Sequence, residues 1–437
     1  MKLNVYRNAV RVGMLDIFTN EPFFGFTYDS EYLASPNARQ LSLSLPLAEA
    51  RYPSNAARPF FEGLLPEGGA RDTIARRLGV PRTSAVKLLG ALGRDCAGDI
   101  SVIEEDDALT AKHDAALGAR AHEYEFFKDG LLGIAENPHE EVARLQEEMR
   151  LSLAGGQEKI ALYHKQNDTM HEGWYIPLHG SPSTHIIKPG ILEQYYPGIT
   201  LNEFLCVRAA SACGIPAVDA ELLYPGTPIL VTPRYDRVFS DGKVNGLEPV
   251  SRIHQEDCCQ ACGVNPELKY EHDGGPGFKQ IRDLLVKHVR QPIDDIATLV
   301  KLCIFNYLIG NCDAHAKNLS ILQNVDGTVS LAPAYDLIST SIYDGRYGSR
   351  LSRNMGMRIG IHENIDKVNF DDFKIFSGDV RMRLQQVRIY GEELAQKLPG
   401  AFEAAGRIAD REGFHYAGEL ISQIMAGCDK RAKVLLR

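Results

Sequence analysis

The chain has 437 residues, 44% of them hydrophobic, and a formal net charge of −9, which is typical of a globular protein with more than one domain. It has no apolar run long enough to span a membrane and no signal-peptide pattern at its start, so we expect a cytoplasmic protein with no membrane partner. An acidic chain is also a poor candidate for broad contact with nucleic acid, because it repels phosphates.

Nine cysteines are scattered along the chain, and some of them allow a zinc site to be drawn. Cys258, Cys259 and Cys262 form one group, and Cys312 with His315 forms a second pair of zinc-ligand types. The groups are roughly 50 residues apart, which is long for a compact zinc module, and small thiols pack well in helices. We interpret the cysteines as buried thiols and keep zinc as the weaker alternative.

Residues 1–145 are predicted to form an N-terminal domain with a small sheet and several helices. Alternating apolar and polar residues predict short strands within residues 2–15, 40–47 and 99–105. Helical spacing predicts helices within residues 58–69, 85–95 and 138–149. The polar stretch from 106 to 150 is expected to lead into the next domain.

Residues 146–250 are predicted to form a strand-rich lobe. Strands are expected within residues 151–164, 173–180, 183–189, 221–225 and 227–238, the first two as a hairpin. A helix at 201–214 is expected to start with Asn202 as its cap and to stop at Gly214.

Residues 251–437 are predicted to form a mostly helical lobe. An amphipathic helix at 294–310 ends at Gly310, and a hairpin follows with Asp326 and Gly327 as its turn. Protein kinases have this order of elements: a small sheet with one helix, followed by a helical lobe that carries a polar loop and a hairpin. The predicted fold class is therefore α+β, with a protein-kinase-like bilobal fold.

Three side chains around this hairpin have the spacing of a phosphoryl-transfer site. Asp313 and Asn318 are five residues apart, as in a kinase catalytic loop, where the aspartate orients the attacking hydroxyl group and the asparagine binds a metal ion. Asp336 follows the hairpin, where kinases carry a second metal-binding aspartate. Oxygen ligands of this kind suit Mg²⁺. The spacing alone is a weak signal, so the other parts of a kinase should occur in order.

Candidates for those parts precede the loop in the expected order. Gly155 and Gly156 would let backbone N–H groups approach phosphates, although a plain hairpin turn is the commoner explanation. Lys188 lies near the end of a predicted strand and would contact the α- and β-phosphates of ATP. The alternative interpretation is that Lys188 is an ordinary residue at the edge of the sheet. Glu203 would form an ion pair with Lys188, or would simply be an acid favoured at a helix N-terminus.

A predicted strand at 230–237 would supply the hinge that binds adenine. The carbonyl groups of Pro233 and Arg234 and the N–H group of Tyr235 are the candidates, and Asp236 could reach the ribose. The chain departs from standard kinases, because Asn311 and Cys312 replace the His-Arg before the catalytic aspartate and D-F-G and A-P-E motifs are missing.

These segments resemble the HipA family of serine/threonine kinases, the toxins of bacterial HipBA-type toxin–antitoxin pairs. The resemblance covers nearly the whole chain and rests on ordered blocks such as "FFEGLLPEG", "LGRDCAGDISVI", "SLAGGQEKIAL", "THIIKP", "KYEHDGGPG", "NYLIGNCDAHAKN" and "PAYDLIS". It implies that Asp313 is the catalytic residue, that Asn318 and Asp336 bind Mg²⁺, and that Ser152 is autophosphorylated to switch the enzyme off. The ATP-binding residues that it implies are Ala154, Gly155, Gly156, Gln157, Glu158, Lys159, Lys188, Pro233, Arg234, Tyr235, Asp236, His315, Lys317, Asn318, Tyr335 and Asp336.

The resemblance also implies cofactors and partners. ATP and Mg²⁺ are expected, with a HipB-like helix-turn-helix antitoxin that makes most of the contact with operator DNA. The implied substrate is an aminoacyl-tRNA synthetase, such as glutamyl-tRNA synthetase, and Gln255 lies in a block that the family places near the active site. Two alternatives stay open: a small-molecule phosphotransferase on a related fold, and a non-catalytic pseudokinase that serves as a corepressor.

Overall fold

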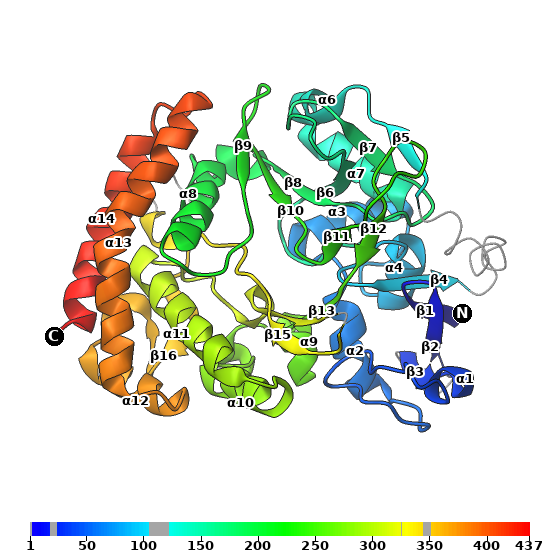
Figure 1. The fold of residues 1–437 in the computed structure, drawn as a ribbon, viewed down its shortest axis with the longest axis horizontal. Helices are drawn as coiled ribbons and strands as arrows, with labels where there is room; N and C mark the ends of the chain where they lie inside the picture. Colours follow the sequence, from blue (N-terminus) through cyan, green and yellow to red (C-terminus); the bar gives the residue numbers. More distant parts are fainter. Residues whose placement is uncertain (1, 18–23, 105–121, 325, 344–350) are drawn as a thin grey trace. The chain divides into compact units, whose positions relative to one another are not determined.

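The structure is a computed structural model that describes residues 2–17, 24–104, 122–324, 326–343 and 351–437 (Figure 1). Contacts divide the chain into two compact units. The first consists of Met1–Pro189, Arg234–Pro266 and Leu322–Val325, and the second of Gly190–Pro233, Glu267–Ile321 and Asp326–Arg437. These units do not match the three predicted domains one to one, so the boundaries at 145 and 250 stay a prediction. Much of the polar stretch predicted after residue 105 lies outside the described residues.

The first unit begins with an antiparallel sheet in the order β3-β2-β1-β4. Its strands are β1 (Lys2–Arg7), β2 (Val10–Ile17), β3 (Phe24–Tyr28) and β4 (Ile100–Glu104). The predicted strands at 2–15 and 99–105 are therefore confirmed, but the one at 40–47 is wrong. Leu41 and Leu45 are buried as the alternation suggests, yet the segment turns at a Ser42–Leu45 bridge.

Helices cover this first sheet and supply most of its core. They are α1 (Ser30–Leu33), α2 (Ser54–Gly63), α3 (Gly68–Leu78) and α4 (Ala85–Leu92). Phe60 and Phe61 of α2 pack with Phe24 and Phe26 of β3 in one buried cluster. Burying each ring contributes about 2 kcal/mol relative to exposure, which explains why the predicted helical stretch at 58–69 folds onto the sheet.

A second group of strands in the first unit runs in the order β5-β7-β6-β8, all antiparallel. These are β5 (Tyr124–Phe126), β6 (Ile160–His164), β7 (Trp174–Pro177) and β8 (His185–Pro189), with helices α6 (Gly130–Glu136) and α7 (Pro138–Met149). The hairpin of β6 and β7 is confirmed. Residues 151–159 are not part of it, so the strand predicted within residues 151–164 begins only at Ile160. Later segments of this unit are β11 (Arg237–Phe239), β12 (Val250–Arg252), β13 (His254–Asp257) and α9 (Cys258–Cys262).

The second unit is mainly helical, as predicted. Its helices are α8 (Ile199–Ala212), α10 (Phe278–His288), α11 (Pro292–Ile309), α12 (Phe370–Asp379), α13 (Leu384–Arg411) and α14 (Ala417–Leu435). Short strands accompany them, namely β9 (Glu221–Leu223), β10 (Ile229–Pro233), β15 (Val329–Leu331), β16 (Asn354–Ile359) and β17 (His362–Asn364), and β14 (Ser320–Gln323) continues out of this unit. The long helix α13 packs against α8, α11 and α14 (Figure 1), so the C-terminal helices support the helix that leads into the predicted catalytic loop.

The start of α8 corrects one prediction. Asn202 is not the N-cap, because the helix begins at Ile199 after Gly198. The carboxylate of Glu193 instead accepts the N–H groups of Gly198 and Thr200. The predicted stop is confirmed, since the helix ends at Ala212 with Cys213 as its C-cap, and Gly214 follows with a φ of +84°. None of the described helices is both long and apolar enough to cross a membrane.

Candidate active site

The site is built at the C-terminal end of α11. Pro292 and two aspartates open this helix, an apolar stretch from Leu299 to Ile309 buries it, and Gly310 closes it with a φ of +78°. A Cβ at Gly310 would lie 2.7 Å from a guanidinium nitrogen of Arg431 and would overlap the Ser341 side chain. Glycine is therefore required for both conformation and space, and the chain is turned sharply into residues 311–319.

The backbone of this loop is held by its own side chains. The N–H group of Asp313 donates to Oδ1 of Asn311 at 3.1 Å. The carbonyl group of Asp313 accepts the His315 N–H group at 2.9 Å and Nδ2 of Asn318 at 3.0 Å. These bonds explain the D-x-x-x-x-N spacing locally, because they bring Asn318 back to Asp313. The Asp313 side chain is exposed, and the amide oxygen of Asn318 remains available as an acceptor.

The segment that carries Asp336 is fixed on both sides. Ala334 exchanges backbone hydrogen bonds with Pro216 and Val218, and Ser339 exchanges two with the side chain of Asn202, at 2.9 and 3.0 Å. Between these anchors Asp336 has a φ of +52°, a left-handed conformation that costs about 1–2 kcal/mol for most residues and that aspartate tolerates better than most. The surroundings hold it there, which is a common feature of functional sites.

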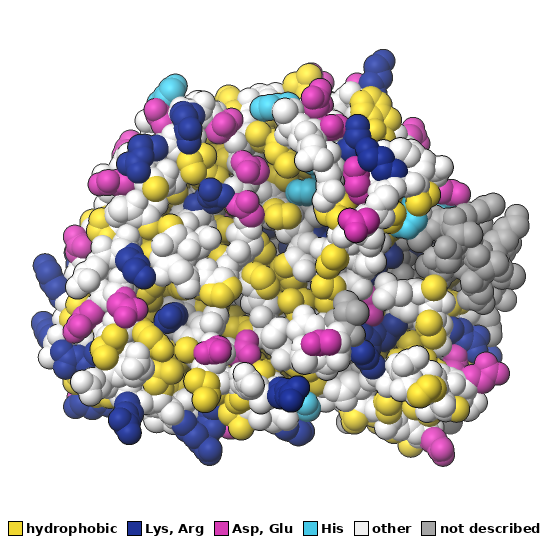
Figure 2. Space-filling model, in the orientation of Figure 1, with side chains coloured by type: hydrophobic (Ala, Val, Ile, Leu, Met, Phe, Trp, Pro, Cys, Tyr) yellow, Lys and Arg dark blue, Asp and Glu magenta, His cyan; other side chains and the backbone are white. Residues whose placement is uncertain are grey.

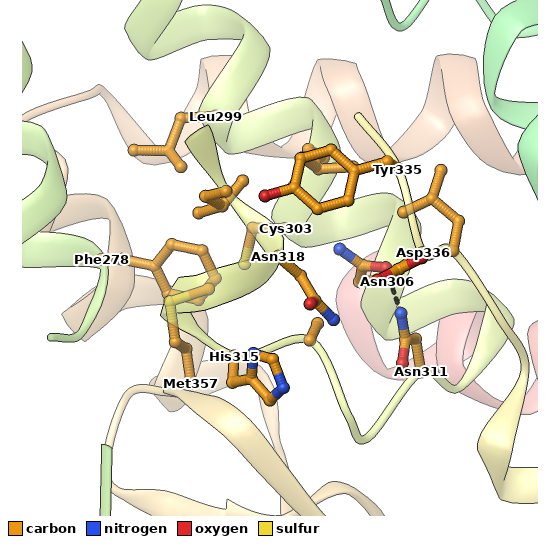
Figure 3. Close-up of a pocket in the computed structure, with 14 residues that line it drawn as sticks. Phe278, Leu299, Cys303, Asn306, Asn311, His315, Asn318, Tyr335, Asp336 and Met357 are labelled. Carbon is orange, nitrogen blue, oxygen red and sulfur yellow. Dashed lines mark hydrogen bonds between the residues drawn. The ribbon is translucent and has the colours of Figure 1, made fainter. Parts of the chain in front are cut away.

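Four of the predicted residues line one pocket, shown in Figure 3. They are His315, Asn318, Tyr335 and Asp336. Apolar side chains of α10 and α11 form much of the rest of its wall. An amide and a carboxylate that present oxygen to one space are a donor set that fits Mg²⁺, so these residues fit the expected metal ion.

Two asparagines of the pocket were not predicted as site residues. Oδ1 of Asn306, on α11, accepts Nδ2 of Asn311 at 2.9 Å (Figure 3), and Asn311 in turn holds the Asp313 N–H group. The signal in the sequence is a pair of amides that flank Gly310 at the end of an otherwise apolar helix. This relay connects the helix to the catalytic loop.

Tyr335 contacts the loop at Lys317. The Tyr335 hydroxyl group donates to the Lys317 carbonyl group at 2.7 Å and lies 2.6 Å from Oγ of Ser320. The Lys317 side chain is buried. Behind the loop, the N–H group of Gly356 in β16 donates to the Cys312 carbonyl group at 2.8 Å. A Cβ at Gly356 would lie 2.7 Å from the backbone of the residue before His315 and of His315 itself, so β16 presses closely on the loop.

The predicted phosphate-binding loop lies in the first unit. Ser152 is fully buried, and its Oγ donates to the Leu64 carbonyl group at 2.8 Å. Its N–H group donates to the Asp95 carbonyl group at 3.1 Å, and the Gly155 carbonyl group accepts the Glu67 N–H group at 2.9 Å. Segments far earlier in the chain therefore hold this loop, which no local pattern could predict.

The glycines of this loop differ in what they permit. Gly155 has a φ of +113°, a conformation that residues with a side chain rarely adopt, so a substitution there would be strained. Gly156 is exposed with open space around it. Glu158 lies 3.0 Å from Nδ1 of His139. Ala154 and Gln157 are partly buried.

The predicted hinge leads into a buried ion network in the first unit. Arg234 binds Asp236 through two nitrogens, at 3.0 and 2.8 Å, and Arg237 and the Gly98 N–H group also contact Asp236. Burial alone would raise the pKa of Asp236, but the arginines and hydrogen bonds lower it. Both carboxylate oxygens are engaged, so these contacts do not favour the predicted ribose contact.

Asp95 is the centre of the same network. Arg234, Arg237 and Arg252 all lie within 3.5 Å of its carboxylate, and Oγ of Ser183 donates to it at 2.7 Å. Burial would raise the pKa of Asp95, but the three guanidinium groups hold it far below its usual range. Because the Asp95 carbonyl group binds the Ser152 segment, this rigid network also supports the phosphate-binding loop.

The remaining predicted residues are placed as follows. The hydroxyl group of Tyr235 donates to the amide of Gln255 at 2.6 Å. Lys188 is buried on β8 in the first unit, and Glu203 is buried on α8 in the second, so their ion pair stays a prediction. Pro233 ends β10, and the division between the units falls directly after it.

The cysteines support the interpretation as buried thiols. Cys258 and Cys259 are buried, as is Cys312. Burial raises the pKa of Cys258 and of Cys312, which disfavours the thiolate that zinc requires. Within the described residues there is no group of three or more histidine, cysteine or acidic side chains placed to hold a metal ion.

Comparisons with known proteins cover nearly the whole chain. A family model for the HipA-like C-terminal domain matches residues 151–402, and one for the HipA N-terminal domain matches residues 3–103. "Putative kinase Y4mE" of Sinorhizobium fredii is 35% identical over 413 residues, which are 93% of this chain and 92% of that protein. The serine/threonine-protein kinase toxin HipA of Shewanella oneidensis is 28% identical over 357 residues, or 79% of this chain and 76% of the toxin.

A solved structure supports the fold. The chain is similar to one in the complex of Shewanella oneidensis HipA, HipB and operator DNA, with a TM-score of 0.79, 23% identity and coverage of 99% of this chain and 98% of that one. At this identity the likeness shows the fold. The predicted α+β class with a HipA-like fold is therefore confirmed.

Proposed function

This chain belongs to the HipA family, and we propose that it is a Mg-ATP-dependent serine/threonine protein kinase that acts as the toxin of a toxin–antitoxin pair. The observation that carries the proposal is the pocket that Asn318 and Asp336 share, with Asp313 exposed directly before its lining residue Ala314. An exposed carboxylate beside two oxygen donors for Mg²⁺ is what phosphoryl transfer from ATP requires.

In this proposal Asp313 orients the hydroxyl group of the acceptor and takes its proton. The acceptor oxygen forms a bond to the γ-phosphorus while the bond from that phosphorus to the leaving oxygen of ADP breaks, so ADP departs with the electron pair. Asn318 and Asp336 hold Mg²⁺, which neutralises charge on the phosphates when it is bound. The products are ADP and a phosphorylated serine or threonine.

The nucleotide contacts are assigned from the family resemblance. Backbone N–H groups within residues 154–159 would bind phosphates, Lys188 would bind the α- and β-phosphates, and the backbone of residues 233–235 would bind adenine. The positive φ of Gly155 supports a loop built for close approach of phosphate. His315, Lys317 and Tyr335 would complete the site on the side of the catalytic loop.

We further propose that autophosphorylation of Ser152 switches the enzyme off. The support is its environment, because the hydroxyl group is fully buried and donates to a carbonyl group. A phosphate adds about two negative charges and has no donor for that carbonyl group. The segment must therefore leave its position, both to be phosphorylated and to accommodate the product, and the phosphate-binding loop leaves with it.

The proposed partners follow from the family. A HipB-like helix-turn-helix antitoxin would restrain the enzyme and carry it to operator DNA, and the substrate would be an aminoacyl-tRNA synthetase such as glutamyl-tRNA synthetase. The Shewanella relative was solved with HipB and operator DNA. The net charge of −9 and the mixture of basic and acidic side chains on the face in Figure 2 favour DNA contact made mainly by the antitoxin.

The test is incubation of the purified protein with labelled Mg-ATP beside Asp313→Asn, with phosphate located by mass spectrometry. We expect label on Ser152 of the wild type and none on the variant, and the intact mass must first show that Ser152 is unoccupied. ATP binding without transfer to any protein, but with transfer to a small molecule, would favour a small-molecule phosphotransferase. No ATP binding at all by an unmodified, folded protein would favour the pseudokinase corepressor.

A further inference from the structure

The proposed catalytic carboxylate already has a partner outside its own loop. The hydroxyl group of Tyr270 donates to Oδ1 of Asp313 at 2.7 Å. Both residues belong to the second unit. The hydrogen bonds within the loop involve the backbone N–H and carbonyl groups of Asp313. The phenol is therefore the contact that bears on the orientation of the carboxylate.

The ring of Tyr270 contacts two imidazoles. His272 stacks on it with a centroid distance of 5.4 Å and an interplanar angle of 20°. His315, from the proposed catalytic loop, meets it edge to face at 5.2 Å and 80°. Aromatic pairs in these geometries contribute about 0.5–1.5 kcal/mol each beyond burial, so two contacts hold the ring in place.

The backbone around Tyr270 is also fixed. Its carbonyl group accepts the N–H groups of Asp273 and Gly275, at 3.0 and 2.9 Å. The carboxylate of the next residue, Glu271, accepts the N–H group of Arg358 at 2.8 Å and Nε of Arg358 at 3.0 Å. A strand of the same unit therefore anchors the turn, and the phenol is presented by a rigid support.

We propose that Tyr270 is a positioning residue that fixes the rotamer of the Asp313 carboxylate for phosphoryl transfer; the inference rests on the proposed function. Hydrogen bonds fix the backbone of Asp313, but an exposed aspartate side chain can still rotate. A phenol that donates to Oδ1 removes this freedom and leaves Oδ2 for the hydroxyl group of the acceptor. The contacts that fix Tyr270 favour a positioning role. A tyrosine that merely blocked the position of the acceptor hydroxyl group would not need this support.

The test compares Tyr270→Phe with Tyr224→Phe, an exposed tyrosine of the same unit that is 58% accessible. The phenylalanine at 270 keeps both ring contacts and loses only the hydroxyl group. We expect kcat for transfer to fall about tenfold, the usual effect of one hydrogen bond to a charged group, with KM for ATP unchanged. The control should retain the wild-type rate.

The double variant Tyr270→Phe with Asp313→Asn decides whether the tyrosine acts through the aspartate. We expect its residual rate, measured at high enzyme concentration over a long incubation, to equal that of Asp313→Asn alone, because the two losses then share one cause. Independent losses that multiply would overturn the proposal, and so would a faster Tyr270→Phe enzyme, which would identify the phenol as a block in the acceptor position.

Folding and the proposed function are checked separately. If Tyr270→Phe lowers the melting temperature, His272→Ala provides a second variant, which removes the stacked ring of an exposed residue and its 3.6 Å contact with Asp273 and should slow transfer in the same direction but less. An unchanged rate in that variant would then count against the proposal. A wild-type enzyme no faster than Asp313→Asn would instead mean that the proposed kinase function has failed.

Discussion

Replacing Ser152 by aspartate should expel the segment that carries it. Ser152 is 0% exposed, and its hydroxyl group lies 2.8 Å from the carbonyl oxygen of Leu64. A carboxylate in that place has no proton to donate. Its negatively charged oxygen would therefore face the Leu64 carbonyl oxygen, which carries a partial negative charge, and the two would repel each other. Water cannot reach the site to solvate the new charge.

The magnitude follows from comparing the two ways of relieving this conflict. Keeping the carboxylate buried without a partner costs several kcal/mol. Releasing the segment breaks the bonds from the Ser152 N–H group to Asp95 and from the Glu67 N–H group to Gly155, which contribute about 1 kcal/mol each, and exposes the buried Leu153 side chain, which costs about 2 kcal/mol. The buried state adds repulsion between the carboxylate and the Leu64 carbonyl oxygen to the cost of the buried charge, so release is the state of lower free energy. The control Ser152→Ala loses only the hydroxyl bond, about 1 kcal/mol, and should stay in place.

The assay is amide hydrogen exchange of residues 150–156 followed by mass spectrometry, together with the affinity for ATP. In Ser152→Asp these amides should exchange like an open chain and ATP binding should weaken at least about tenfold, whereas Ser152→Ala should match the wild type. Wild-type protection in Ser152→Asp would refute the reasoning. Equal exposure in both variants would show that the hydroxyl bond, and not the charge, decides where the segment lies.

Three further predictions concern other parts of the molecule. Burial raises the pKa of Glu256 to about 7, so the stability that the protonated carboxyl group contributes is complete below an unfolded pKa of about 4.3 and is lost as pH rises through 7. The free energy of unfolding of Glu256→Gln, measured with denaturant, should therefore rise relative to that of the wild type by about 3 kcal/mol between pH 4 and pH 8. A difference between the two proteins that does not depend on pH would contradict this. Gly356→Ala places a Cβ 2.7 Å from the backbone of the proposed catalytic loop, so the rate of phosphoryl transfer should fall by about 10²-fold. The control Gly400→Ala, whose Cβ meets open space, should keep the wild-type rate. Equal rates in the two variants would show that β16 moves to make room and the loop stays in place. Asp336→Asn keeps a residue type that tolerates the left-handed φ but removes the negative charge that would bind Mg²⁺. The Mg²⁺ concentration that gives the half-maximal rate should therefore rise, while the melting temperature stays the same. An unchanged Mg²⁺ requirement would show that Asp336 is not a metal ligand.

The sequence predicted best where local chemistry decides the structure. The helix at 294–310 was correct because its apolar face and Gly310 act within a few residues of each other. The spacing of Asp313 and Asn318 was informative for the same reason, since the hydrogen bond between them closes within one turn of the chain. Asp336 was predicted as a site residue because it comes shortly after a recognisable hairpin.

Prediction failed where a distant segment outcompeted the local pattern. Residues 40–47 alternate like a strand, but Ser42 and Leu43 bind the buried carboxylate of Glu256 and the segment turns. Asn202 has the chemistry of a helix cap, yet its amide is used to hold Ser339, 137 positions later in the chain. Capping and alternation are local preferences of about 1 kcal/mol, and tertiary contacts of similar strength override them.

The amino-acid sequence by itself thus determined several helices, the order of the candidate phosphoryl-transfer residues and the family. Only the tertiary structure decided what supports them: that Ser152 is held by residues 64 and 95, that Tyr270 reaches Asp313, and that Asn306 and Asp336 line one pocket. A single sequence encodes contacts along the chain through spacing. Contacts between distant segments depend on how whole elements pack, and no local period carries that information.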